Sequence, residues 1–161
     1  MILNRSRPGG EEKKGGASRA WRRFVETPPD LPIGPVVRRG LADPDRLSET
    51  EEAAYDAPFP TPESKAGAVA WPLLVPMEPD DPVAEVMRET RARLAEWSKP
   101  AFELFAPGDP ILGGAQGFFR SLIPTASEQP EVTIDDAGHF LQEEQGPEIA
   151  RHVRAFVDRT S

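Results

Sequence analysis

The sequence predicts an α/β fold, in which parallel strands are flanked by helices and accompanied by a separate helical segment. Two apolar runs, 101–105 and 132–134, have the composition of buried strands. Between them lies a short helical stretch, 115–122, and a strand–helix–strand order of this kind joins parallel neighbours. Earlier in the chain, short helical stretches alternate with proline-rich segments, as in a lid over a site.

The first part of the chain contains one short strand-like run and one helical stretch. Ile2-Leu3-Asn4 is the stub of a strand, and the Gly- and charge-rich residues 7–16 are expected to form an exposed linker. Residues 18–25 are predicted to be helical, with Trp21 and Phe24 on one face. Four prolines between 27 and 35 then rule out a continuous helix.

Helical periodicity and start signals predict four more helices. They cover residues 49–54, 63–70, 83–97 and 147–159. The helix over 63–70 is expected to stop before Pro72, because a proline disfavours helical backbone in the residue ahead of it.

Composition excludes several classes of function. The chain of 161 residues carries a net charge of −8, which argues against binding to nucleic acid or to anionic membranes. No apolar run approaches the ~20 residues that span a bilayer, and no signal peptide is recognisable, so we expect a cytoplasmic protein. With no cysteine and two histidines, neither a metal site nor a cofactor is predicted.

The stretch 135–144 places His139 between a predicted strand and a helix. Imidazole is the side chain best suited to moving protons near neutral pH, and Gly138 lets the backbone turn tightly beside it. Taken alone, a single histidine is more often structural than catalytic.

Asp109 gives His139 a possible partner. It follows the predicted strand 101–105 and precedes His139 by 30 residues, which leaves room for a helix and a second strand. Because the carboxyl ends of parallel strands meet at one edge of a sheet, the acid and the base are expected to meet there. The acid would orient the imidazole and stabilise its charged form. The alternative is an ordinary turn aspartate, since Gly-Asp-Pro is common turn chemistry.

Five motifs occur in a fixed order along the chain. They are Tyr55–Pro60, Lys65–Ala68, Trp71–Pro76, Gly108–Ile111 and Gly138–Glu143. Together they resemble the haloalkane dehalogenases of the α/β-hydrolase superfamily, over nearly the whole chain but only over the later half of such an enzyme. The resemblance implies the C-terminal part of an α/β-hydrolase fold plus a helical cap. Residues 1–9 would be a core-strand remnant and linker, 10–79 the cap, and 80–161 the C-terminal core.

The resemblance also implies roles for individual residues. In that family an aspartate displaces halide and forms an alkyl-enzyme ester, and a histidine activates the water that hydrolyses it. His139 would be this base and Asp109 its acid partner. Trp21 matches a halide-binding tryptophan of the cap, with a cap-packing aromatic as the alternative. The positions that match or adjoin the apolar substrate pocket, with cap packing as their alternative, are Trp71, Pro72, Val75 and Ile111. The family more often has phenylalanine where Trp71 stands, which leaves the pocket size open.

The sequence contains no Gly-x-Ser-x-Gly and no comparable nucleophile elbow. We therefore expect one of three situations: a C-terminal piece carrying two of three catalytic residues, a truncated remnant without activity, or a chain that complements a separate N-terminal half. The expected substrate is a small halogenated hydrocarbon. Asp109 and His139 alone also fit a serine esterase. An epoxide hydrolase fits less well, because it needs cap tyrosines and Tyr55 is the only tyrosine.

Overall fold

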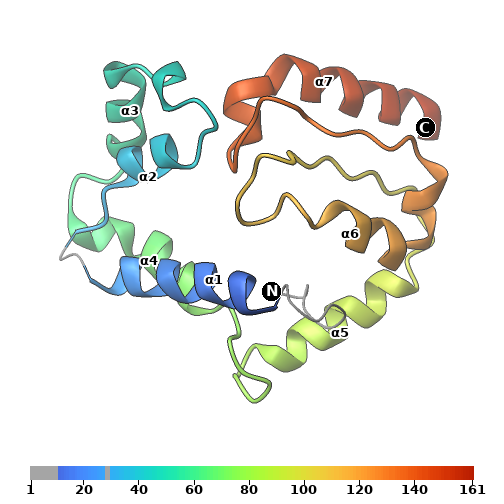
Figure 1. Ribbon diagram of the computed structural model, residues 1–161, viewed down its shortest axis with the longest axis horizontal. Coiled ribbons are helices and arrows are strands. Elements are labelled where there is room, and N and C mark those ends of the chain that lie inside the picture. Colours follow the sequence, from blue (N-terminus) through green and yellow to red (C-terminus); the bar gives the residue numbers. More distant parts are fainter. Residues whose placement is uncertain (1–10, 28–29) are drawn as a thin grey trace. The chain divides into compact units, whose positions relative to one another are not determined.

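The computed structural model describes residues 11–27 and 30–161, and the side chains from residue 19 onward. The predicted strand stub at 2–4 and the predicted segment 1–9 lie outside the described residues. Regular structure in the described part is helical (Figure 1). The elements are α1 (Glu11–Glu26), α2 (Ile33–Arg39), η1 (Pro44–Arg46), α3 (Glu49–Asp56), η2 (Pro62–Lys65), α4 (Ala66–Leu73), α5 (Ala84–Ala95), α6 (Gln116–Leu122), η3 (Pro124–Glu128) and α7 (Leu141–Thr160).

The chain divides into two compact units, each interrupted in sequence. The first unit contains the described residues up to 36 together with 49–91, and the second contains 37–48 together with 92–161. The short segment 37–48, between α2 and α3, therefore packs with residues that lie far along the chain.

The first unit is built around α1 and α4, which pack against each other (Figure 1). Trp21 stacks on Phe24 one turn later, with ring centroids 5.4 Å apart, as their predicted shared face requires. Polar contacts fix the connections. The Asp56 carboxylate accepts the N–H of Ile33 at the start of α2, at 3.0 Å, and the buried Lys65 ammonium lies 2.8 Å from Asp30.

The second unit has a small apolar core centred on Ile134, the most deeply buried large side chain of the described residues. Ala106 and Ala137 complete the core, and flanking apolar side chains pack on it: Leu104, Val132, Leu141 and Ile149. Arg120 of α6 fixes the loop that follows it. Its guanidinium contacts Glu103 at 3.0 Å and donates to the carbonyls of Ala126, Ser127 and Gln129.

The predicted parallel strands 101–105 and 132–134 are not formed as strands. What remains is a single parallel bridge between Phe105 and Thr133, with the N–H of Ile134 donating to the Phe105 carbonyl at 2.9 Å. The direction and adjacency of the two runs, and the helix α6 between them, are as predicted. A parallel strand needs ladder partners and covered faces, and in the described residues each of these runs forms its backbone bridge only with the other.

Helix boundaries show three departures from prediction. Residues 11–16, expected to be linker, form the start of α1. Helix α4 continues through Pro72 to Leu73, because a proline in the last turn of a short helix removes few ladder bonds. Helix α7 begins at Leu141, six residues before the predicted start, but Gln145 has non-helical backbone (φ −129°, ψ 31°) just ahead of Pro147. The predicted start at Pro147 thus corresponds to a break within α7.

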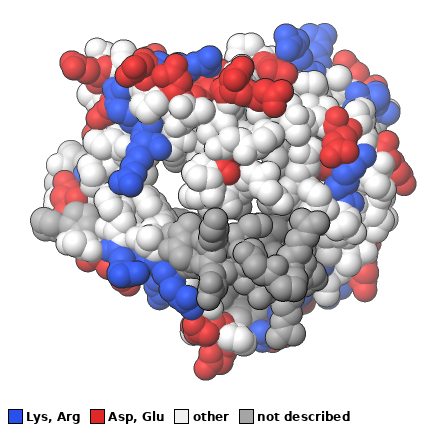
Figure 2. Space-filling view, viewed as in Figure 1, with Lys and Arg blue, Asp and Glu red and all other residues white. Residues whose placement is uncertain are grey.

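Charged side chains of both signs are visible in Figure 2, mostly toward the edge of the view. In the part of the chain that the structure describes, no helix is both long and apolar enough to cross a bilayer.

Gly138 lies where two distant segments touch, and replacing it with alanine is expected to destabilise the second unit. A Cβ at this position would lie 2.5 Å from the Gly40 carbonyl oxygen and 2.7 Å from the Ala42 nitrogen, both backbone atoms. Overpacking of this kind costs about 1–3 kcal/mol, so Gly138→Ala should lower the urea midpoint measured by circular dichroism. The matched control is Gly117→Ala in α6, where a Cβ meets no atom within 4 Å. It should be neutral or stabilising by up to ~1 kcal/mol, and equal midpoints for the two variants would contradict the close approach.

Candidate active site

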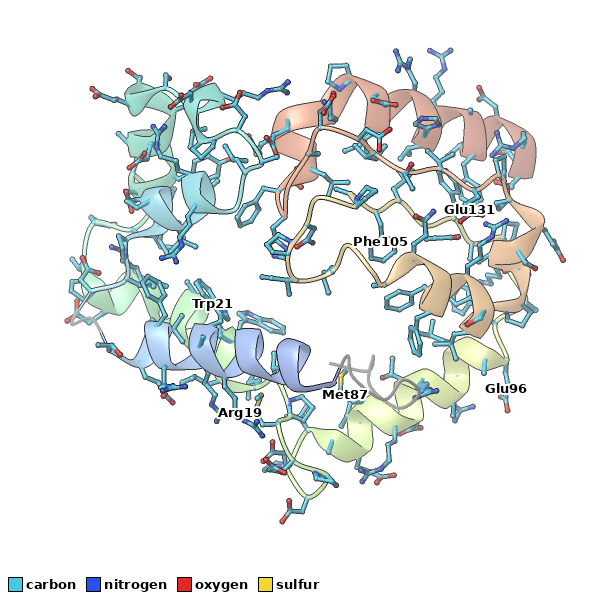
Figure 3. All side chains as sticks on the ribbon, in the orientation of Figure 1. Arg19, Trp21, Met87, Glu96, Phe105 and Glu131 are labelled. Carbon is cyan, nitrogen blue, oxygen red and sulfur yellow. The ribbon has the colours of Figure 1, made fainter. Side chains whose placement is uncertain are left out.

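Asp109 sits in a tight turn four residues after the bridge at Phe105, and Figure 3 labels Phe105 on the segment that leads there. The Asp109 N–H donates to the Ala106 carbonyl at 3.0 Å, and one carboxylate oxygen, Oδ1, accepts the Ile111 N–H at 2.7 Å. This is the local bonding typical of a turn aspartate. It holds the carboxylate in place and leaves the other oxygen, Oδ2, for a second partner. Asp109 is 9% exposed.

His139 lies in the loop between the bridge residue Thr133 and α7. Its backbone N–H donates to the Gly40 carbonyl at 2.7 Å, and its ring meets the Phe140 ring edge-on. Two residues before Gly138, Asp136 adopts positive φ (51°), a left-handed conformation that costs energy in a residue other than glycine. The loop that carries the imidazole therefore depends on contacts from outside it.

The two side chains meet as the sequence predicts. His139 Nδ1 lies 3.0 Å from Asp109 Oδ2, and the histidine side chain stays 32% exposed while the aspartate is buried. An ionised carboxylate can only accept, so this pairing places the imidazole proton on Nδ1. The lone pair of Nε2 is then available to take a proton from a neighbouring molecule. The arrangement can serve as an oriented general base.

Glu144, in the first turn of α7, holds the histidine loop by hydrogen bonds. Its carboxylate accepts three backbone N–H groups, from Ala42 (3.0 Å), Asp43 (3.0 Å) and Gly138 (2.7 Å). Burial acts to raise the pKa of Glu144, but these three bonds and the nearby charge of Arg46 outweigh it and lower the pKa below its ordinary value. Glu144 therefore stays ionised in the folded protein although it is only 7% exposed.

The lowered pKa predicts a pH-dependent contribution to stability. A carboxylate with a lower pKa in the folded state stabilises the fold above its ordinary pKa of 4.5, and this contribution is lost as the pH falls through the folded-state value. The free energy of unfolding should thus differ most between wild type and Glu144→Gln near pH 7, and the difference should shrink below about pH 4.5. Urea unfolding at several pH values measures this. Glu143→Gln, at an exposed neighbour in the same turn, is the control. A difference for Glu144→Gln that is the same at pH 7 and pH 3 would contradict the shift.

The remaining predicted site residues belong to both units. Ile111 lies next to the Asp109 turn in the second unit and is 47% exposed. The others are in the first unit. Trp21 projects from α1 (Figure 3) and stacks on Phe24, as a packing aromatic would. Trp71, near the end of α4, is 74% exposed, and Pro72 and Val75 are half-buried.

Glu144 and the segment 40–43 are features of the site that the sequence did not point to. The amide donors at Ala42 and Asp43 lie 102 and 101 residues before Glu144, and no local pattern links residues so far apart. A second glutamate at the start of a helix is ordinary, because acidic side chains favour the first turn. Of the three N–H groups that Glu144 accepts, only that of Gly138, six residues earlier, is near it in sequence.

Comparisons with known proteins point to one family. The chain is 37% identical over 150 residues to the haloalkane dehalogenase of Psychrobacter cryohalolentis, over 93% of this chain and 49% of that protein. It is 39% identical over 156 residues to the haloalkane dehalogenase of Mycolicibacterium paratuberculosis, over 97% of this chain and 51% of that protein. No family model matches the sequence.

A solved structure agrees with these relatives. The tetrameric haloalkane dehalogenase DpaA from Paraglaciecola agarilytica NO2 matches with a TM-score of 0.72 and 28% identity, over 92% of this chain and 47% of that chain. The chain thus spans about half the length of the relatives that it matches.

Proposed function

We propose, from the premise that this chain is related to the haloalkane dehalogenases, that it supplies the acid and the histidine for the hydrolytic cleavage of carbon–halogen bonds. The observation that carries the proposal is the 3.0 Å contact between Asp109 Oδ2 and His139 Nδ1, which leaves Nε2 free to act as a base. The named relatives and the solved dehalogenase support the reaction class.

The chemistry has two steps. In the first, a carboxylate nucleophile attacks the halogen-bearing carbon, a C–O bond forms, and the halide leaves with the electron pair of the carbon–halogen bond. In the second, His139 Nε2 takes a proton from water as the oxygen of that water attacks the ester carbonyl. The alkoxide then leaves with that proton as the alcohol, and the carboxyl group loses its remaining proton to solvent and is a carboxylate again. Asp109 stabilises the imidazolium that forms. The nucleophile of the first step would come from polypeptide beyond this sequence.

Residues of the first unit would supply most of the cap in this proposal. Its indole donor, Trp21, would bind the departing halide, because an indole N–H donates without titrating. Apolar side chains of the same unit and of the Asp109 turn would line the pocket: Trp71, Pro72, Val75 and Ile111. The substrate would then be a small halogenated hydrocarbon, and the steps described need no metal or cofactor. Under this proposal residues 10–79 form the cap and 80–161 the C-terminal core, and a separate N-terminal half is the natural partner.

The 161-residue chain alone is expected to release no halide from a short haloalkane above background. The sequence holds no nucleophile elbow, so no ester forms, and water activated by His139 has nothing to attack. Incubation with a brominated alkane and an ion-selective measurement of bromide tests this. Release by the chain alone that disappears in His139→Ala would contradict the prediction and reveal a nucleophile within these residues. Release that persists in that variant would reflect background chemistry.

A further inference from the structure

One buried side chain bonds both the histidine loop and a segment far from it in sequence. Residues 135–139 include the positive-φ residue Asp136 and end at His139, whose ring nitrogen Nδ1 contacts Asp109. Outside this loop, the Glu144 carboxylate bonds Gly138, and the Gly40 carbonyl bonds the N–H of His139. The N–H groups of Gly138 and His139 are therefore both hydrogen-bonded to groups that lie outside the loop.

The same carboxylate also bonds the segment to which Gly40 belongs. Glu144 also accepts the N–H groups of Ala42 and Asp43, so one carboxylate bonds both Gly138 and the segment that carries Gly40. Arg46 adds a further bond between the two segments, because its Nη1 donates to the Glu144 backbone carbonyl at 2.8 Å. We call Glu144 with residues 40–43 the carboxylate clamp.

The atoms around the carboxylate clamp are closely packed. A Cβ on Gly138 would strike the backbone of 40–42, and a Cβ on Gly40 would lie 2.5 Å from the Phe140 ring. Bonds from a carboxylate to backbone N–H groups are charge-assisted and roughly twice as strong as neutral ones. Because Glu144 is buried, solvent does not replace those bonds when the carboxylate is removed.

We propose that Glu144 is a positioning residue for the base, which sets the place of the His139 backbone through the carboxylate clamp and so keeps Nδ1 against Asp109. In this proposal, Glu144 contacts neither the His139 imidazole nor Asp109. It acts through Gly138 and through the segment 40–43. The kinetic part of the inference rests on the proposed function, whereas the effect on the acid–histidine contact does not.

The first test measures the contact itself in the 161-residue chain. A proton on Nδ1 that is hydrogen-bonded to a buried carboxylate gives a downfield signal in a proton NMR spectrum, and its loss in His139→Gln assigns it. Glu144→Gln should abolish or broaden this signal while the far-UV circular dichroism keeps its helical form. Glu143→Gln, at the exposed neighbour, should keep the signal. A signal in Glu144→Gln as sharp as in wild type, or no assignable signal in wild type, would overturn the proposal.

The second test uses the chain combined with the N-terminal half of a relative. A displacement of a catalytic group by about 1 Å can cost ~10²-fold in rate, so Glu144→Gln should slow ester hydrolysis by roughly that factor. Formation of the ester, read as the initial burst of halide, should stay at the wild-type rate. Glu144→Asp keeps the charge on a shorter side chain and should fall between wild type and Glu144→Gln. A purely structural role would lower burst and turnover together.

The outcomes separate the two proposals. If Glu144→Gln does not fold, Glu144→Asp decides the positioning role: slowed hydrolysis with an unchanged burst supports it, and wild-type hydrolysis overturns it. If the wild-type combination releases no halide while the NMR signal responds to Glu144→Gln, the proposed function fails and the positioning role stands. If the combination turns over and Glu144→Gln behaves like Glu143→Gln in both tests, the positioning role fails alone.

Discussion

Combining this chain with the N-terminal half of a haloalkane dehalogenase is expected to produce halide-releasing activity that neither piece has alone. The physical reason is that the two steps of the reaction need different groups: a carboxylate that forms the ester, and the oriented His139 that hydrolyses it. Supplied in trans or as a fusion, the N-terminal half would bring the first, and the pair at 3.0 Å would bring the second. Release of bromide over many turnovers from a short brominated alkane is the measurement.

The histidine variant separates true turnover from other effects of mixing. His139→Ala should lower steady-state release by about 10²–10⁴-fold, the usual contribution of a general base. The matched control is His152→Ala on α7, whose imidazole lies 3.6 Å from Glu148 and far along the helix from the loop. It should retain wild-type turnover. Sustained release that survives His139→Ala would show that the base lies elsewhere.

Replacing the acid should stop the reaction after the first step. In Asp109→Asn, the amide can donate to Nδ1, which moves the imidazole proton to Nε2 and removes the lone pair that accepts a proton from water. The corresponding change in a Ser-His-Asp triad lowers turnover by roughly 10⁴-fold. In the combined enzyme we expect one halide per active site in a burst, followed by a stall, because ester formation does not use His139. The trapped ester adds the alkyl mass to the protein, which mass spectrometry detects.

The control for this variant lies in the histidine loop. Asp135→Asn changes an exposed aspartate four residues before His139 and should leave both burst and turnover unchanged. If Asp109→Asn turns over at the wild-type rate, the 3.0 Å contact has no role in hydrolysis, and Asp109 serves only the turn that bonds Ile111.

Local sequence signals were sufficient for the pair itself. The Gly-Asp-Pro turn and the Gly-His step each follow an apolar run, and the two runs are parallel neighbours, so the acid and the base meet as predicted. The extended strands were not predictable from composition, because a strand exists only with its ladder partners. The same apolar residues at 101–105 and 132–134 form one bridge in the described part of the chain.

Non-local contacts account for what the sequence missed. Glu144 looks like an ordinary acidic residue of a first helical turn until its partners at 42 and 43 are known. Pro72 predicted a helix stop from local sterics, yet α4 includes it in the last turn. The role of Glu144 depends on partners far away in sequence, and Pro72 is tolerated because it lies in the last turn of α4. A window of neighbouring residues does not contain this information.

The membership of residues 37–48 in the second unit bears on how the protein could be re-engineered. Exchanging caps between relatives is an attractive route to new specificity, and the predicted boundary would move residues 10–79 as one block. Such a block carries Gly40, Ala42 and Asp43, whose backbone groups bond His139 and Glu144. Such a chimera would change the segment that bonds the His139 loop and, under the proposed function, the substrate pocket as well. Grafting around residues 37–48, and leaving that segment with its own α7, keeps the two properties separable.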